Sequence, residues 1–145
     1  MTNRRRTLAA AALCLLLVCS LLATGCSFSL PFGSADLTFK NSTGNTVHSV
    51  YVSPETSSTW GDPVNSDQVR NGGSLKIDWD DVEGYGPGTY DVAAVDEYGM
   101  NYDVFGVYLT TGAKMELSPA SNGTATLTVT ANGSTNVYYA NCYYS

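Results

Sequence analysis

Beyond residue 35, apolar and polar residues alternate in short runs, and turn-forming residues separate these runs about every ten positions. A period of two places successive side chains on opposite faces of a β-strand, so each run predicts a strand with one buried face. No run beyond residue 35 has the three-to-four spacing of an amphipathic helix. The expected strands are residues 37–40, 46–53, 74–80, 89–96, 101–109, 114–117, 124–130 and 136–144.

Three turn signals support these boundaries. Asn132-Gly133 lies between two alternating runs and favours a two-residue hairpin, because both central positions of that turn need a positive φ. Residues 41–44, Asn-Ser-Thr-Gly, predict a turn between the first two strands, and Ser53-Pro54 is expected to end the second strand. Eight short strands over residues 36–145 predict an all-β domain, either a single antiparallel β-sandwich of immunoglobulin-like size or a partly closed barrel.

The first 25 residues have a different pattern. Three arginines, Arg4 to Arg6, precede an apolar run over residues 8–23 that only Ser20 interrupts with a polar side chain. A helix of this length falls short of the roughly 20 residues that cross a bilayer core. The pattern therefore favours an export signal over a permanent membrane span.

The end of the apolar run reads Ala23-Thr24-Gly25-Cys26, which resembles the lipobox of bacterial lipoproteins. This resemblance implies that residues 1–25 are a lipoprotein signal peptide and that residues 26–35 are the lipidated N-terminus and a tether. Cys26 would carry the acyl chains and anchor the protein on the extracytoplasmic side of a membrane of the bacterial envelope. Ordinary cleavage that yields a soluble secreted protein is the alternative.

Loss of the signal peptide changes the charge. Three of the seven Lys and Arg residues would leave with it, while all thirteen Asp and Glu residues would stay, which gives a net charge of −9. Such a charge makes nucleic acid and anionic lipid headgroups poor partners on electrostatic grounds. It leaves a surface suited to solubility, to cations or to a basic partner.

Cysteine usage agrees with export and lipidation. Cys14 and Cys19 lie within the apolar run, and Cys26 is the expected lipid site, so Cys142 is the one thiol left. We expect Cys142 to fill space as a small apolar side chain, because its neighbours offer no positive charge that would activate it. If Cys26 is not lipidated, a disulfide between Cys26 and Cys142 is the competing prediction.

A second resemblance rests on five segments, residues 39–44, 50–54, 60–62, 90–92 and 96–99. Their turn formers and core aromatic residues resemble a small β-sandwich module that recurs, largely uncharacterised, in exported bacterial proteins. The similarity extends over about residues 37–102. It implies a fold and carries no catalytic residue.

Candidate chemistry is sparse. His48 is the only histidine, so a multi-histidine metal site is excluded, and its strand neighbour Ser49 should face the other way. Asp78, Asp80, Asp81 and Glu83 form an acidic cluster that is either a solvated loop or a weak calcium site. Calcium is accordingly the one cofactor that the sequence suggests.

The aromatic residues favour binding. Trp60 is expected to pack over one end of the domain, with a platform for a sugar ring as the alternative. The candidate contact residues for a ligand or partner are Trp60, Tyr85, Tyr98, Tyr138 and Tyr143. We therefore expect a lipid-anchored envelope protein that binds another envelope protein or a glycan and is not an enzyme. The alternatives are a purely structural lipoprotein and a small hydrolase or calcium-dependent enzyme that uses the Asp78–Glu83 loop or His48.

Overall fold

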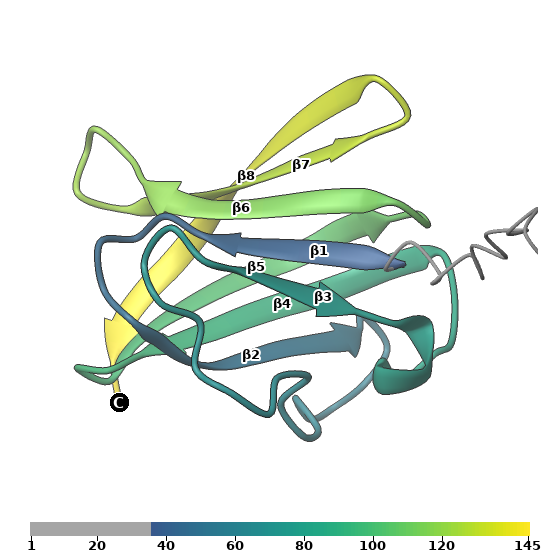
Figure 1. Cartoon of the computed structure of the whole chain (residues 1–145), viewed down its shortest axis with the longest axis horizontal. Helices are drawn as coiled ribbons and strands as arrows, with labels where there is room; N and C mark the ends of the chain where they lie inside the picture. The colour runs from purple at the N-terminus through teal and green to yellow at the C-terminus, as the bar shows by residue number, and fades with distance from the viewer. Residues whose placement is uncertain (1–35) are drawn as a thin grey trace, which may run out of the picture. The chain divides into compact units, whose positions relative to one another are not determined.

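The structure is a computed structural model that describes residues 36–145. The expected signal peptide, lipidation site and tether lie outside the described residues. The described part is nearly all β-structure (Figure 1). It contains β1 (Leu37–Asn41), β2 (Val47–Pro54), β3 (Ser74–Ile77), the 3-10 turn η1 (Trp79–Asp81), β4 (Gly88–Asp96), β5 (Met100–Leu109), β6 (Ala113–Pro119), β7 (Ala125–Ala131) and β8 (Ser134–Tyr144).

All eight strands belong to one sheet, in the order β2-β4-β5-β8-β7-β6-β1-β3, which curls into a half-barrel. The prediction of an all-β domain is confirmed. The prediction of a wholly antiparallel arrangement is wrong at one place, because β1 and β6 run parallel, with Phe39 opposite Met115. The two strands are far apart in the sequence and no short turn connects them, so their pairing could not be predicted from a turn signal.

β8 holds the two halves of the curled sheet together. Its first part, residues 134–140, pairs with β7, and its last part, residues 141–144, pairs with β5. Figure 1 shows the β7–β8 hairpin extending away from the strands on either side of it. At its tip, Asn132 and Gly133 have φ values of 51° and 76°, which confirms the predicted two-residue turn.

The core lies on the inner face of the curl, where alternate residues of the strands meet. Val50 and Val52 of β2 point inward while Tyr51 points outward, as their alternation predicts. Burial of each such aliphatic side chain contributes about 1.5–3 kcal/mol. The largest fully buried side chains are Phe39, Leu37, Ile77, Leu109, Met115, Leu117 and Leu127.

The predicted third strand is too long. β3 ends at Ile77, and the chain turns into η1 at Trp79. Trp79 is still buried, since it stacks on Tyr90 with ring centroids 5.7 Å apart and its Nε1 donates to Thr111 Oγ1 at 3.0 Å. Ile77 and Trp79 are both buried and two positions apart, which is the spacing of one strand face, although the strand ends at Ile77. The alternation therefore predicted a longer strand than the structure has.

The outer edge of β2 is closed by the loop that follows it, residues 55–73, which we call the edge loop. Val47 and Val69 exchange two backbone hydrogen bonds of 2.8 and 2.9 Å, and Val64 donates to the carbonyl of Val50 at 2.8 Å. Asn65 adds side-chain contacts, since its Oδ1 accepts from the N–H of Val50 at 2.6 Å and its Nδ2 donates to the carbonyl of His48 at 2.8 Å. The edge of β2 is thereby covered from Val47 to Val50 without a further strand.

Candidate functional site

A shallow cleft lies on the outer face of the β2, β4 and β5 strands. Strand register brings the polar residues of this face together, since Ser53 lies opposite Asp91, and Ala93 lies opposite both Tyr51 and Asp103. The cleft has a volume of about 180 Å³. Its lining residues are Ser53, Ser57, Ser58, Thr59, Trp60, Asp91, Asp103 and Phe105.

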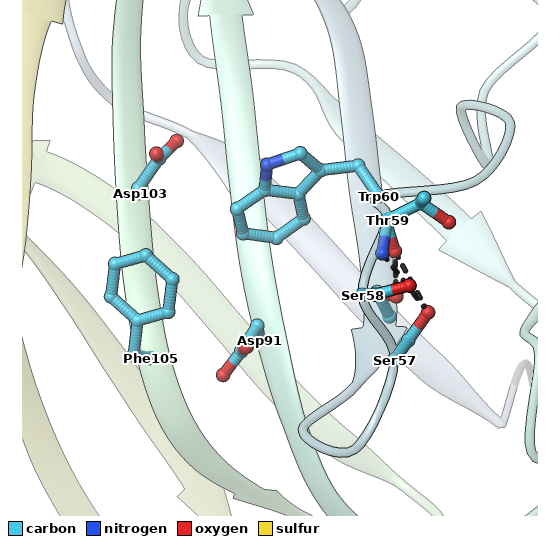
Figure 2. Close-up of a pocket in the computed structure, with 8 residues that line it drawn as sticks. Ser57, Ser58, Thr59, Trp60, Asp91, Asp103 and Phe105 are labelled. Atoms are coloured by element: carbon cyan, nitrogen blue, oxygen red, sulfur yellow. Dashed lines mark hydrogen bonds between the residues drawn. The ribbon is translucent and has the colours of Figure 1, made fainter.

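Trp60 forms the apolar wall of this cleft, which we call the Trp60 cleft. Its ring centroid is 6.0 Å from that of Phe105 and 6.5 Å from that of Tyr51, within the range of favourable aromatic pairs. Figure 2 shows the indole reaching from the edge loop across β4 toward Asp103 and Phe105 on β5. Trp60 is half-buried and is not a member of the core, and its ring pairs with Tyr51 and Phe105. Its packing over one end of the domain stays a prediction.

Local hydrogen bonds hold the segment before Trp60 against β2. The hydroxyls of Ser53 and Ser57 both donate to the carbonyl of Thr59, each at 2.9 Å. The N–H of Ser57 donates to the carbonyl of Pro54 at 2.8 Å and closes a tight turn directly after the strand. The indole is therefore held in place by an anchored turn. Because this turn is already ordered, less conformational entropy is lost when a ligand binds.

Two carboxylates provide the charge of the Trp60 cleft. Asp103 is only 7% exposed, and its Oδ2 accepts a 2.8 Å hydrogen bond from the hydroxyl of Tyr143. This hydrogen bond, together with burial, raises the pKa of Tyr143. Asp91 is half-buried and its Oδ1 accepts from the N–H of Gly106 at 2.9 Å. Each carboxylate is thus oriented by one donor and keeps other lone pairs for a ligand.

Gly106 has a structural reason to be glycine. Its φ of 67° lies in the left-handed region, next to an irregularity in the β4–β5 register between Tyr90 and Val92. The irregularity turns the N–H of Gly106 toward Asp91 and leaves the Phe105 ring 54% exposed at the rim of the cleft.

A second cleft, of about 290 Å³, adjoins the first and shares Trp60 with it. It collects Asp62, Asp80, Asp81 and Glu83, together with the predicted contact residue Tyr85. Asp78 does not line it. Within residues 36–145, no group of three or more His, Cys, Asp or Glu side chains is arranged to hold a metal ion. A calcium site on this acidic loop stays a prediction.

Of the other predicted contact residues, Tyr143 reaches the Trp60 cleft through its hydrogen bond to Asp103, while Tyr98 and Tyr138 lie elsewhere. Tyr98 is exposed in the turn after β4, and Tyr138 is half-buried, with its hydroxyl 3.4 Å from the backbone nitrogen of Tyr108. His48 is exposed on β2 and lines none of the clefts described above. Cys142 is half-buried against the core, as expected of a small filler.

Asp91, Asp103 and Phe105 belong to the cleft and were not predicted from sequence. Alternation does assign Asp91 and Asp103 to the outer face of their strands, which is the available signal. Their proximity to Trp60 depends on strand register and on the path of the edge loop, and neither has a local sequence signature.

A comparison of the chain with known protein families, with curated proteins and with solved structures found no match. The similarity to the recurrent exported β-sandwich module therefore stays a prediction from sequence. In the part of the chain that the structure describes, no helix is long and apolar enough to cross a membrane.

Proposed function

We propose that this chain is a lipid-anchored, exported protein of the bacterial envelope whose β-domain binds a basic partner protein through the Trp60 cleft. In this proposal a protonated Lys or Arg side chain enters the cleft, lies against Trp60 and Phe105, and pairs with Asp103 and Asp91. The domain binds and does not catalyse. The two halves of the curled sheet serve as the two layers of a sandwich, with β8 shared between them.

One observation carries the proposed ligand class: two partly desolvated carboxylates, Asp91 and Asp103, line the same cleft as half-buried Trp60 and exposed Phe105. A cation over an aromatic face gains about 0.5–2 kcal/mol, and a carboxylate in a partly buried site attracts it further. The net charge of −9 for residues 26–145 supports the same ligand class, because it raises the local concentration of basic partners. The volume of the cleft, about 180 Å³, suits one side chain more than a whole drug-sized ligand.

The anchoring part of the proposal rests on residues 1–26. Two acyl chains on Cys26 would hold the protein at a membrane stably, whereas a single chain binds only marginally. Measurement of the intact mass of the protein purified from its host is the test. A chain that starts at Cys26 with added acyl mass is the expected result, while a free thiol or a disulfide to Cys142 contradicts lipidation.

The binding part can be tested by calorimetric titration with a blocked three-lysine peptide and with the same peptide acetylated at every Nε. We expect saturable binding of the charged peptide alone, weaker at high salt because screening reduces the attraction. Asp103→Asn should lower the affinity at least about tenfold, since it removes one charge of a desolvated pair. Asn keeps an acceptor for the Tyr143 hydroxyl, so the cleft retains its shape.

Asp67→Asn is the matched control, because it removes the same charge from an exposed position outside the cleft. Equal losses in Asp67→Asn and Asp103→Asn would show that the peptide responds only to net charge, and would contradict the proposed site. Equal affinity for the acetylated peptide would contradict cation recognition itself.

A further inference from the structure

β8 has one strand edge without a partner. Along residues 134–140 it pairs with β7 on one side, and its pairing with β5 on the other side covers only residues 141–144. β5 in turn pairs with β8 only through Met100–Asp103, so the two strands separate beyond Asp103. Among residues 36–145, no other strand takes up the free side of residues 134–140.

Hairpin geometry shows which backbone groups point outward. Ala131 and Ser134 flank the two-residue turn and so form a hydrogen-bonded pair, and hydrogen-bonded pairs alternate along the hairpin. The N–H and C=O groups of residues 134, 136, 138 and 140 therefore face β7. Those of Thr135, Val137 and Tyr139 face the open side.

This open edge lacks the features that usually protect a strand from pairing. Such protection comes from charged residues, proline, bulges or covering segments. Residues 134–140 contain no charge, no proline and no glycine, and their pairing with β7 is unbroken. Val137 and Tyr139 are 55% and 72% exposed, and both are residue types that pack well in sheets.

The charge distribution indicates what occupies the edge. All thirteen Asp and Glu residues lie between Asp36 and Glu116, and no side chain from Leu117 to Ser145 is charged. A basic partner would be drawn to the acidic surface and away from this neutral hairpin. Two copies of the chain repel each other through their acidic surfaces, and they meet at least electrostatic cost where both are uncharged.

We propose that the open edge of β8 pairs antiparallel with β8 of a second copy, forming a two-fold symmetric dimer with a sheet continuous across both chains. A two-fold axis at Val137 places it opposite the partner's Val137, and places Thr135 opposite the partner's Tyr139 and Tyr139 opposite the partner's Thr135. An isologous contact of this kind needs one self-complementary strip, and this strip fulfils that condition. Pairs of β-branched and aromatic residues on neighbouring strands stabilise a contact of this kind.

The test uses the full chain in detergent micelles at two protein concentrations about tenfold apart. Sedimentation should show a shift from monomer to dimer with concentration. Amide hydrogen exchange resolved by residue should slow at least about tenfold at Thr135, Val137 and Tyr139 as the dimer forms, because these N–H groups become bonded. The amide of Asn136, which already faces β7, should be unchanged and serves as the internal control.

Two substitutions at one position complete the experiment. Val137→Glu places two carboxylates opposite each other at the axis and should abolish the dimer, whereas Val137→Thr keeps a β-branched side chain and should preserve it. A chain that stays monomeric at both concentrations overturns the proposal. So does a dimer in which the three outward amides exchange as fast as in the monomer, since that dimer would use another surface. The exchange measurement needs no variant, so it decides the matter even if Val137→Glu fails to fold.

Discussion

The side chain of Asn65 replaces a strand partner for Val50, because its Oδ1 accepts the outward-facing N–H of Val50 at 2.6 Å. The Nδ2 of the same amide donates to the carbonyls of His48 and Asp67 at 2.8 and 2.9 Å. One buried amide, only 8% exposed, thus joins the edge of β2 to the loop that covers it.

Replacement of Asn65 should destabilise the sheet at this edge. Asn65→Ala leaves the N–H of Val50 without its partner, and an unsatisfied buried donor costs about 1–3 kcal/mol. We expect chemical denaturation to show that Asn65→Ala lowers the free energy of unfolding by this amount. Asn65→Asp is the matched variant, since it keeps the acceptor for Val50 and loses the donors to His48 and Asp67. A loss in Asn65→Ala no larger than that of Asn141→Ala, at an exposed position, would contradict this role.

Asp96 should make the protein sensitive to acid. Its carboxylate is 3% exposed and accepts hydrogen bonds from the backbone of Tyr98 and Met100 and from the side chains of Asn45 and Tyr102. Burial raises the pKa of Asp96, but these four hydrogen bonds outweigh that effect and leave the pKa below its ordinary value.

A carboxylate with a lowered pKa in the folded state stabilises the protein above its unfolded pKa, near 3.9. This contribution is lost as the pH falls through the folded pKa. We expect Asp96→Asn to cost about 1.5–3 kcal/mol near neutral pH and to flatten the decline in stability below pH ~4. Denaturation at several pH values is the measurement. If the free energy of unfolding of Asp96→Asn falls with decreasing pH as steeply as that of the unmodified protein, other carboxylates govern acid unfolding.

Calcium should have little effect on stability. Asp62, Asp80, Asp81 and Glu83 around the second cleft are all exposed to solvent. If this loop is a solvated surface, as the proposed function implies, millimolar Ca²⁺ should raise the melting temperature by less than about 1 °C. A saturable rise that disappears in Asp81→Asn, together with turnover of a cell-wall substrate, would instead support a calcium-dependent enzyme. Asp67→Asn is the control for a general effect of charge.

Local patterns of the sequence predict local structure well. The positive φ values of Asn132 and Gly133 follow from a turn that only such residues form readily, and Pro54 ends β2 because it has no N–H for the ladder. Buried Trp79 lies in a 3-10 turn and not in a strand. Alternation of apolar and polar residues indicates which residues are buried, but not whether the backbone between them is extended.

The pairing of strands that are distant in the sequence is harder to predict from the sequence. The parallel β1–β6 pair joins segments more than seventy residues apart, and parallel pairs carry no turn signature. Trp60 was recognised as a candidate contact because of its residue type, while Asp103 was missed because its nearness to Trp60 depends on the register of three strands. Asn65 is an ordinary loop residue by sequence, and only the course of the edge loop shows its role.

The edge loop has two tasks at once, since it carries Trp60 and, through Val64, Asn65 and Val69, covers the edge of β2. Opening the loop therefore removes a wall of the cleft and uncovers a strand edge in one event. An occupant of the cleft binds only the covered form and shifts that equilibrium by mass action. The proposed ligand would then stabilise the form in which the edge of β2 is covered. The protein without ligand would open more often at this edge and would aggregate more readily there than the protein with ligand bound.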